Sequence, residues 1–442
     1  MLSSDRLVAV WPNTYLYPKS LQLLKPSLSK KILVVAESID VEDSSGSKAN
    51  VALIKNLKTA GFEVLVYHYT RKEISLGFVP CIAIKENRKS PLFYLSRLQR
   101  KLQHTFNWNL AKYLEPRFGF SFTFFNDSKS IARALKKQIN FQPDLVLTLS
   151  KGASFRPHHA LLALPELHNK WLAYIHDPYP FHYYPEPYNW SEPGYQKKIE
   201  FFKEVASKCK WAGYPSLLLA EWMEDHFSGL KAKRLVIPHQ LTKENELPIA
   251  LPSWFNPEKF NLLHAGNLMK QRPPFGLIRG FMRFLERNPI AQENSRLVLL
   301  GNSSYHRERL KKYEGQERQL YISDGYMKYK QVLEMQMKAS ANIILESKAA
   351  SSPFLPGKFP HCISAGKPIL LLGPEKSETR RLLGQDYPFW SEIEDVERIS
   401  TLIENLYNQW LNESHTLQMR RNDLRSYLSE DYLKNEIKKL LQ

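Results

Sequence analysis

A lysine in a proline- and glycine-rich stretch is the first residue with clear chemical potential. Lys358 lies in residues 351–372, after an apolar run at residues 342–345 that predicts a buried strand. The stretch predicts a loop, then a short helix from Gly357 to just before Gly366, then another strand. Free N–H groups at a helix start, the helix dipole and the lysine charge together suit an anion such as a diphosphate. The alternative is an ordinary connection with a solvated lysine.

A histidine and an aspartate form the second candidate pair. His176 and Asp177 follow a predicted buried strand at residues 171–175, and Pro178 prevents the strand from continuing. Side chains just beyond the carboxyl ends of parallel strands face the ligand crevice. Asp177 could orient a hydroxyl group or accept its proton, and His176 could donate or accept a hydrogen bond. The alternative is an aspartate that caps a turn and a histidine bonded to backbone.

A third candidate group combines glycine with basic residues. Gly266 follows a predicted strand at residues 260–265, and Lys270 and Arg272 come shortly after it. Glycine lets the backbone approach a ligand closely, and the planar guanidinium of arginine can bind phosphate through two parallel hydrogen bonds. The group therefore suits a phosphate. The alternative is a solvated basic turn.

Alternating strands and helices position these residues. Apolar runs predict buried strands of the parallel type, separated by helical patterns, on both sides of residues 240–259. We interpret residues 240–259 as a linker, because they contain three prolines and little periodicity. The first strand–loop–helix unit lacks G-x-G-x-x-G, which argues against a dinucleotide site.

One run of the sequence carries a family resemblance. Residues 357–369, G-K-F-P-H-C-I-S-A-G-K-P-I, resemble the donor-binding loop and helix of retaining glycosyltransferases of family 4, where the usual run is G-K-L-F-E-Y-L-A-A-G-K-P-I. The His-Asp-Pro turn at residues 176–178 and the Gly-Asn-Leu turn at residues 266–268 are similar to turns of the same family. The resemblance covers nearly the whole chain and is strongest over residues 260–372.

The resemblance implies an α/β protein with the GT-B fold, in which two Rossmann-like domains face each other across a cleft. The expected parts are an acceptor-side domain at residues 1–240, a linker at 241–259, a nucleotide-sugar-binding domain at 260–425, and a C-terminal helix at 426–442 that packs back on the first domain.

The resemblance also implies roles for individual residues. The expected catalytic residues are His176, Asp177, Lys270 and Arg272. The expected donor-binding residues are Gly266, Asn267, Gly301, Asn302, Gly325, Tyr326, Met327, Glu346, Pro356, Gly357, Lys358 and His361. The expected acceptor-side residues are Gly46, Gly152, Ser154 and Tyr179. No metal and no cofactor are expected, because lysine, arginine and a helix start can stabilise the diphosphate electrostatically.

One departure from the family pattern concerns two glutamates separated by seven residues. They would fall on Pro353 and His361, and neither residue is glutamate. The second glutamate usually holds the ribose hydroxyls in this family. Three explanations stay open: His361 holds them differently, the donor is unusual, or activity has been lost.

The chain is strongly basic, with a formal net charge of +18 and a pI of about 9.5. This balance suits nucleic acid, an anionic membrane face or phosphorylated substrates, and no nucleic-acid-binding motif supports the first. Residues 96–118 have the pattern of a basic amphipathic helix, which could rest on an anionic membrane or pack on its own domain. The scattered cysteines and the lack of a signal peptide or membrane-spanning run predict a cytoplasmic protein. The basic amphipathic pattern would allow it to be peripheral at the inner face of the membrane.

These features together predict a retaining glycosyltransferase. It would move a sugar from a nucleoside diphosphate sugar to a hydroxyl of a glycan or lipid-linked glycan, in bacterial surface polysaccharide or glycolipid synthesis. Two alternatives stay open: a non-catalytic GT-B protein that binds nucleotide sugars, favoured by the missing glutamates, and a sugar-nucleotide epimerase of the same fold. A nucleic-acid binder rests on charge alone.

Overall fold

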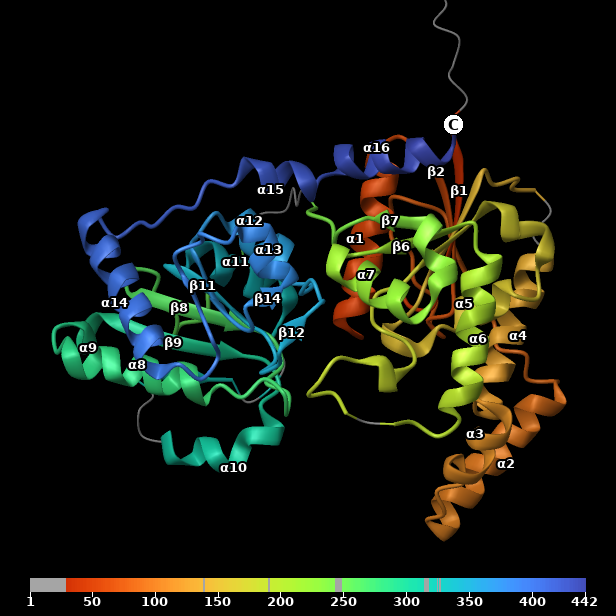
Figure 1. Ribbon diagram of the computed structural model, residues 1–442, viewed down its shortest axis with the longest axis horizontal. Coiled ribbons are helices and arrows are strands. Elements are labelled where there is room, and N and C mark those ends of the chain that lie inside the picture. Colours follow the sequence, from red (N-terminus) through yellow and green to blue (C-terminus); the bar gives the residue numbers. More distant parts are fainter. Residues whose placement is uncertain are drawn as a thin grey trace, which may run out of the picture.

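The computed structural model describes residues 29–442, apart from residues 138–139, 190, 243–248, 314–317, 324 and 326. The described part contains two large parallel sheets, one in each half of the chain, and helices lie against both sheets (Figure 1). No helix in this part has the length and hydropathy needed to cross a membrane.

The first sheet has the strand order of a Rossmann-like domain. Its strands are β1 (Lys31–Ala36), β2 (Glu63–His68), β3 (Cys81–Ala83), β4 (Leu145–Leu149), β5 (Trp171–Tyr174), β6 (Trp211–Tyr214) and β7 (Arg234–Val236). They are parallel and lie in the order β3-β2-β1-β4-β5-β6-β7. The order therefore reverses between β1 and β4.

The second sheet repeats this arrangement. Its strands are β8 (Phe260–Ala265), β9 (Ser295–Leu300), β10 (Leu320–Ile322), β11 (Ala341–Leu345), β13 (Ile369–Leu372) and β15 (Trp390–Ser391), in the order β10-β9-β8-β11-β13-β15. A short separate pair consists of β12 (Ser351–Ser352) and β14 (Lys376–Ser377). The prediction of two Rossmann-like domains is confirmed.

The helices alternate with these strands. The first half contains α1 (Ser45–Thr59), α2 (Pro91–Phe106), α3 (Ala111–Phe118), α4 (Phe122–Lys136), α5 (Arg156–Leu161), α6 (Tyr195–Lys208) and α7 (Leu217–His226). The second half contains α8 (Phe275–Arg287), α9 (Ala291–Asn294), α10 (Arg307–Leu310), α11 (Tyr329–Lys338), α12 (Phe359–Ala365), α13 (Glu378–Leu383), α14 (Val396–Asn412), α15 (Asn422–Tyr427) and α16 (Glu430–Leu440).

Capping residues set several helix boundaries. The Ser44 hydroxyl accepts a hydrogen bond from Ser47 N–H at 3.1 Å, so α1 begins as soon as the polar loop ends. The single helix expected over residues 96–118 is instead the pair α2 and α3. Asn107 interrupts it, because its backbone is left-handed, with φ of 52°, and ends α2.

The last helix returns to the first domain. Leu433 and Ile437 of α16 share a buried core with Leu53 of α1 and Ile32 of β1. Figure 1 shows α15 and α16 along one side of the molecule, with α15 near the second domain and α16 against the first. The two domains are therefore connected at two places along the chain.

Candidate functional site

The candidate residues gather where each sheet reverses its strand order. In the first domain, Glu37 follows β1 and residues 150–154 follow β4. In the second domain, Gly266 follows β8 and Glu346 follows β11. In open parallel sheets a crevice forms at this switch point, beyond the carboxyl ends of the strands. The fold therefore brings together residues that are far apart in the sequence.

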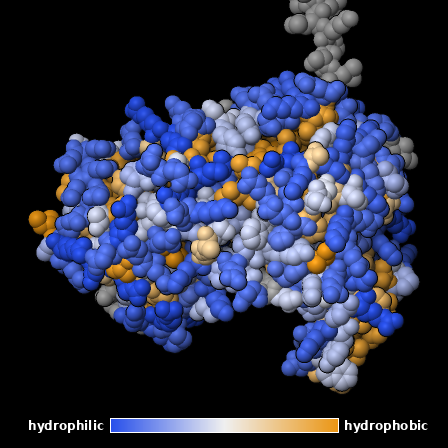
Figure 2. Space-filling model, in the orientation of Figure 1, coloured by the Kyte–Doolittle hydropathy of each residue, from blue (hydrophilic) through white to orange (hydrophobic). Residues whose placement is uncertain are grey.

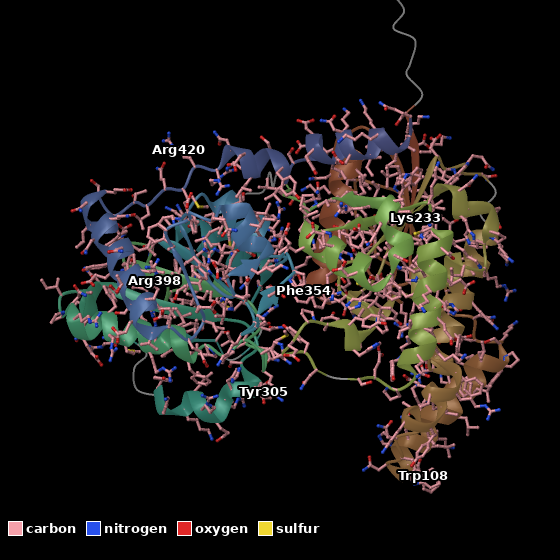
Figure 3. All side chains as sticks on the ribbon, viewed as in Figure 1. Trp108, Lys233, Tyr305, Phe354, Arg398 and Arg420 are labelled. Carbon is pink, nitrogen blue, oxygen red and sulfur yellow. The ribbon has the colours of Figure 1, made fainter. Side chains whose placement is uncertain are left out.

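Direct contacts join the two domains beside these crevices. The first N–H groups of α7 donate to the Glu378 carboxylate at 3.2 and 3.3 Å, and Ser216 Oγ donates to Pro353 O. Phe354, labelled between the domains in Figure 3, has its ring centre 5.7 Å from that of Tyr184. The loop that leads to α12 is therefore held by the first domain as well as by its own.

Two loops of the second domain are tied together by hydrogen bonds. Gly266 N–H donates to Leu300 O at 2.8 Å, and Leu268 N–H donates to Asn302 O at 2.9 Å. Asn302 N–H also donates to Asn267 Oδ1 at 3.0 Å. The predicted Gly-Asn-Leu turn and the turn after β9 therefore form one surface at the edge of the crevice.

A third loop joins this surface through Ser323. Gly301 N–H donates to Ser323 Oγ at 3.0 Å, and Gly325 follows with φ of 148°. Met327 is half-buried and packs against the core beneath. Tyr326, also expected at the donor site, lies outside the described residues.

Replacement of Gly301 should be costly. Its φ is 119°, and a Cβ would lie 2.5 Å from Gly266 O. We expect Gly301→Ala to lower the free energy of unfolding by about 2 kcal/mol or more, through backbone strain and displacement of the neighbouring loop. Urea denaturation measures this. Gly357→Ala is the matched control, because a Cβ there meets nothing within 4 Å. If both substitutions lower the free energy of unfolding equally, the close approach of Gly266 O to Gly301 is contradicted.

Lys358 lies in the crevice of the second domain. It is half-buried, and its Nζ is 3.2 Å from Nδ1 of His264 in β8. A Cβ on Gly266 would lie 2.9 Å from the same Nζ, so glycine makes room for the lysine. Burial, assisted by the nearby Arg272 guanidinium, lowers the pKa of Lys358 to about 7. A bound anion would favour its charged form.

The start of α12 supplies fewer donors than the sequence predicts. The helix begins at Phe359, with Lys358 in the capping position rather than in the first turn. Phe359 N–H donates to Pro356 O at 2.8 Å, and Pro360 has no N–H. Gly357 is exposed at the rim. Attraction of an anion here therefore depends on the lysine charge more than on the helix backbone.

Glu346 and Arg272 both have polar atoms without a partner in the described structure. Glu346 is 2% exposed, and its Oε1 accepts a hydrogen bond from Thr379 Oγ1 at 2.8 Å. Its Oε2 and Arg272 Nε are buried with no hydrogen-bond partner among the described residues. Burial raises the pKa of Glu346 to about 7, and Arg272 opposes this shift. Because buried polar atoms are normally satisfied, the two side chains are suited to a ligand.

Lys270 does not join this cluster. It is exposed, and it takes part in no ion pair between described residues. Arg272, two residues later, is half-buried and acts on the pKa of Asp177, Glu346 and Lys358. Of the two predicted basic residues, the structure places only the arginine side chain among the other candidates.

His176 is held by a neighbouring asparagine. Its Nε2 lies 2.8 Å from Asn50 Oδ1, and Asn50 Nδ2 donates to Ser38 O and Ser150 O. These two carbonyls define the amide orientation, so His176 donates from Nε2. Burial keeps the pKa of His176 well below its ordinary range, and the ring is neutral. Only Nδ1 is left for a substrate contact.

Asp177 is half-buried and lies beside a corner lined by glycine. Burial raises its pKa to about 6, and the charge of Arg272 in the other domain opposes the shift. A Cβ on Gly152 would lie 4.0 Å from Asp177 Oδ2, and one on Gly46 would lie 3.5 Å from Gly152 N. The two glycines therefore leave space next to the carboxylate.

Of the other two acceptor-side predictions, Ser154 stays a prediction and Tyr179 needs correction. Ser154 Oγ donates to Glu37 Oε2 at 2.6 Å, so this hydroxyl supports a carboxylate rather than standing free. Tyr179 does not line the cleft: it is 2% exposed, and its ring centre lies 4.5 Å from that of Phe155 in the core. Its ring points inward because burial of so large an apolar surface is favourable.

His361 lies at the junction of the domains. Its Nε2 is 3.1 Å from Tyr329 Oη, and Lys48 Nζ of α1 lies 4.4 Å from the centre of the Tyr329 ring. Burial lowers the pKa of His361 to about 4, so the imidazole is neutral. A neutral imidazole can hydrogen-bond to a hydroxyl, and its role at the ribose stays a prediction.

Sequence reasoning missed several polar residues of the site. They are Glu37, Lys48, Asn50, His264 and Glu378. Glu37 and His264 carried a usable signal, because each lies at or near the carboxyl end of an apolar strand. The other three lie on helices, and the sequence pattern does not distinguish them from ordinary helix residues.

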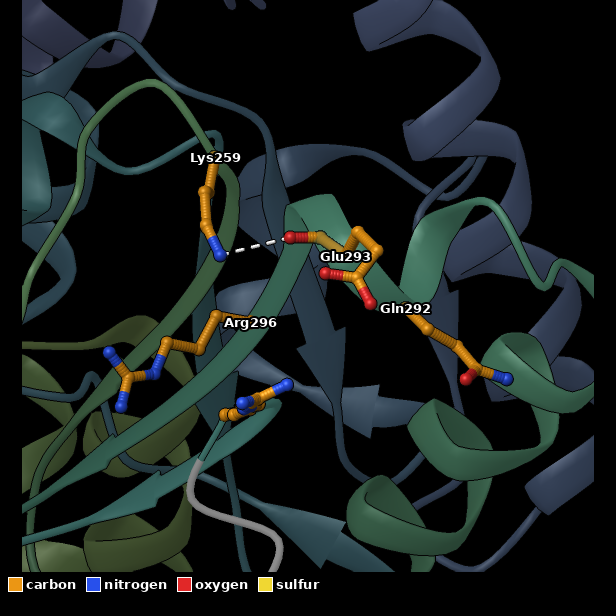
Figure 4. Close-up of a pocket in the computed structure, with 5 residues that line it drawn as sticks. Lys259, Gln292, Glu293 and Arg296 are labelled. Atoms are coloured by element: carbon orange, nitrogen blue, oxygen red, sulfur yellow. Dashed lines mark hydrogen bonds between the residues drawn. The ribbon is translucent and has the colours of Figure 1, made fainter.

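A cavity of about 460 Å³ lies apart from these residues. It is lined by Lys259, Gln292, Glu293, Arg296 and Arg318 (Figure 4). Lys259 directly precedes β8 and Arg296 is near the start of β9, so the cavity lies at the amino ends of the strands. Lys259 Nζ donates to Glu293 O at 2.9 Å. The cavity is therefore at the opposite end of the sheet from Gly266.

Comparison with known proteins gives structural matches only. No family model and no curated protein matches the chain. It is similar to a glycosyltransferase from Rickettsia africae ESF-5, with 12% identity, 94% of this chain and 95% of that chain covered, and a TM-score of 0.53.

Two further similar structures contain sugar ligands. A trehalose-6-phosphate protein from E. coli, bound with UDP-2-fluoro glucose, has 13% identity, 93% and 99% coverage, and a TM-score of 0.57. An alpha,alpha-trehalose-phosphate synthase (UDP-forming) from Burkholderia xenovorans, in complex with glucose-6-phosphate, has 11% identity, 94% and 100% coverage, and a TM-score of 0.59. At these identities the likeness shows the fold, which is GT-B: two Rossmann-like domains facing each other across a cleft.

Proposed function

We propose that the protein is a retaining glycosyltransferase. It moves a hexose from a nucleoside diphosphate sugar to a hydroxyl of a glycan or lipid-linked glycan in bacterial surface polysaccharide or glycolipid synthesis. The observation that carries the proposal is the cluster of Lys358, Arg272, His264 and Glu346 at the switch point of the second domain. The Lys358 amine and the unpaired N–H donor at Arg272 Nε suit a diphosphate group.

The comparisons are compatible with this assignment. Of the similar solved structures, one is bound with UDP-2-fluoro glucose and another is in complex with glucose-6-phosphate. Membership of family 4, and with it retention at the anomeric carbon, rests on the resemblance of residues 357–369.

The proposed mechanism divides the work between the two domains. Lys358 and Arg272 bind the diphosphate and stabilise the charge that develops as it leaves, so that no metal is needed. Asp177 lies on the opposite side of the cleft and acts on the acceptor hydroxyl, which it orients and from which it accepts a proton. Because its pKa is about 6, a large part of the carboxylate is ionised near neutral pH.

The test of the proposal is calorimetric titration of the full chain with UDP-, GDP-, dTDP- and ADP-sugars. Product analysis with glycan and lipid-linked acceptors follows for any donor that binds. Sugar transfer to an acceptor supports the proposal. A new sugar nucleotide formed from donor alone identifies an epimerase, and binding without turnover identifies a non-catalytic protein. Failure of all donors to bind overturns the proposal for the isolated chain.

Donor binding should also take up protons. The pKa of Lys358 is about 7, so above about pH 7.5 the amine is mostly neutral, and a bound diphosphate raises its pKa. Calorimetry in two buffers of different ionisation enthalpy measures the uptake, which we expect to approach one proton per donor. The pKa of Glu346 is also about 7, so this carboxyl is a second group that can take up a proton. Proton uptake by the Glu346→Gln variant measures the contribution of Lys358 alone. Binding enthalpies that are equal in both buffers would contradict this linkage.

A further inference from the structure

A concentrated hydrophobic surface lies on α2 and α3, outside the cleft. Seven of the fifteen exposed large hydrophobic side chains in the described part of the chain fall there: Tyr94, Leu95, Leu98, Phe106, Trp108, Tyr113 and Phe118. Figure 2 shows hydrophobic side chains on this projecting part of the molecule. Single exposed apolar residues are ordinary, but a concentration of them marks an interaction site.

Several apolar residues of α2 are turned away from its own domain. The residues that α2 buries are Ser96 and Gln99, whereas Tyr94, Leu95 and Leu98 are exposed. The neighbouring helix α3 has no buried residue. A surface helix of a globular protein normally turns its apolar side to the core. The helix packs on its own domain through half-buried side chains such as Phe93, but this packing does not explain why Tyr94, Leu95 and Leu98 are exposed.

The far end of this surface is aromatic. Phe106 is the last residue of α2 and Trp108 lies in the segment between α2 and α3, and their rings stack with centres 5.1 Å apart. Figure 3 labels Trp108 at the extremity of the projection. In Figure 1, α2 and α3 project from the first domain on the side away from α15 and α16. The projection is therefore accessible to a large flat partner.

The charge of this surface is mainly positive. Residues 89–118 contain one acidic residue, Glu115, which pairs with Lys198 at 3.2 Å. They contain six basic residues: Lys89, Arg97, Arg100, Lys101, Lys112 and Arg117. Arg97 pairs with Glu86 at 3.2 Å, whereas neither Lys101 nor Lys112 pairs with an acidic residue that the structure describes. The surface therefore complements an anionic partner.

We propose that α2 and α3 form a membrane-docking surface, in which the exposed aromatic and leucine side chains enter the interface of a bilayer and the basic side chains contact anionic headgroups. Tyrosine and tryptophan favour the boundary between lipid and water, and helices with this combination lie in the plane of the interface. A second copy of the chain is disfavoured, because an isologous contact would bring the same cations together.

The test is sedimentation of the full chain with vesicles of phosphatidylcholine, with or without phosphatidylglycerol. The apolar variant is Tyr94→Ser/Leu98→Ser/Trp108→Ser, and the charge variant is Lys101→Glu/Lys112→Glu. The matched control is Ile290→Ser/Tyr305→Ser, which removes two side chains of the second domain that are 83% and 60% exposed. Because every substituted side chain is exposed, unfolding midpoints should change little.

We expect the wild type and the control to bind vesicles with phosphatidylglycerol, and to bind phosphatidylcholine alone at least about tenfold more weakly. Each surface variant should lose about tenfold or more in affinity for the anionic vesicles. The apolar variant loses side chains that would enter the interface, and the charge variant loses two cations, each of which contributes about fivefold. Equal binding by wild type and both variants would overturn the proposal, as would absence of vesicle binding by the wild type.

Two other results would reassign the surface. Concentration-dependent dimerisation that the apolar variant abolishes, without vesicle binding, would identify a second copy as the occupant. Salt-sensitive RNA binding that the charge variant abolishes, again without vesicle binding, would identify nucleic acid. The assay uses no donor, so its failure is independent of the proposed glycosyl transfer.

Discussion

Replacement of Lys358 by methionine should weaken donor binding by about 100-fold or more. The ammonium lies in the crevice beside His264, and each charge-assisted hydrogen bond that it makes to the diphosphate contributes roughly 1.5–3 kcal/mol. Methionine keeps most of the length and apolar surface of the side chain, so packing is retained. Calorimetric titration with the donor that the wild type binds measures the loss.

The stability of this variant separates loss of function from loss of structure. The pKa of Lys358 is lowered to about 7 in the folded protein, from its ordinary value of 10.5. The folded state therefore holds fewer protons than the unfolded state between these values, and this residue makes stability rise with pH across that range. Lys358→Met should remove this dependence and be at least as stable as wild type at about pH 7.

The matched control for this substitution is Lys338→Met. Lys338 is an exposed residue in the last turn of α11. Its replacement should change donor affinity by less than about twofold. If Lys358→Met folds normally and keeps wild-type affinity, the donor does not bind at this crevice.

Replacement of Asp177 by asparagine should lower the rate of transfer by about 100- to 10,000-fold. Asparagine cannot accept the acceptor proton, although it has nearly the same shape. Donor affinity should change far less, since Asp177 belongs to the first domain and the predicted diphosphate contacts belong to the second. Initial rates at saturating donor, together with the dissociation constant of the donor, separate the two effects.

The pH dependence provides a second measurement at this residue. Because the pKa of Asp177 is about 6, the wild-type rate should fall as pH decreases through that value and protonates the base. The residual rate of Asp177→Asn should lack this dependence. Asp386→Asn, at an exposed position of the second domain, should behave as wild type. If Asp177→Asn transfers sugar at the wild-type rate, Asp177 is not the base and its carboxylate has a structural role in the turn.

Local sequence was sufficient for the main strands of this fold. Continuous apolar runs such as residues 31–36 predict strands buried on both faces, and such strands belong to parallel sheets. Ser216 caps the start of α7, where its hydroxyl accepts from Leu219 N–H at 2.9 Å. These features depend on interactions between residues that are close together in the chain, so they can be predicted from the sequence.

Predictions about the site were less complete. Gly266 and Gly301 follow strands that lie side by side, and the structure brings their loops into contact as the strand pattern indicates. The family resemblance placed Tyr179 on the acceptor side, and it is instead part of the core. The position of a residue along the chain predicts which edge of the sheet it occupies. The direction of its side chain after the strand has ended depends on which other elements of the fold pack against it.

Only the tertiary structure decided the electrostatic and surface properties. The lowered pKa of Lys358 and the raised pKa of Asp177 arise from burial between elements distant in sequence, and Arg272 reaches both of them. The outward apolar side of α2 is equally non-local, because periodicity predicts an amphipathic helix without showing which side meets the protein. Burial and charge interaction act through space, so they are defined only when the two domains are in place.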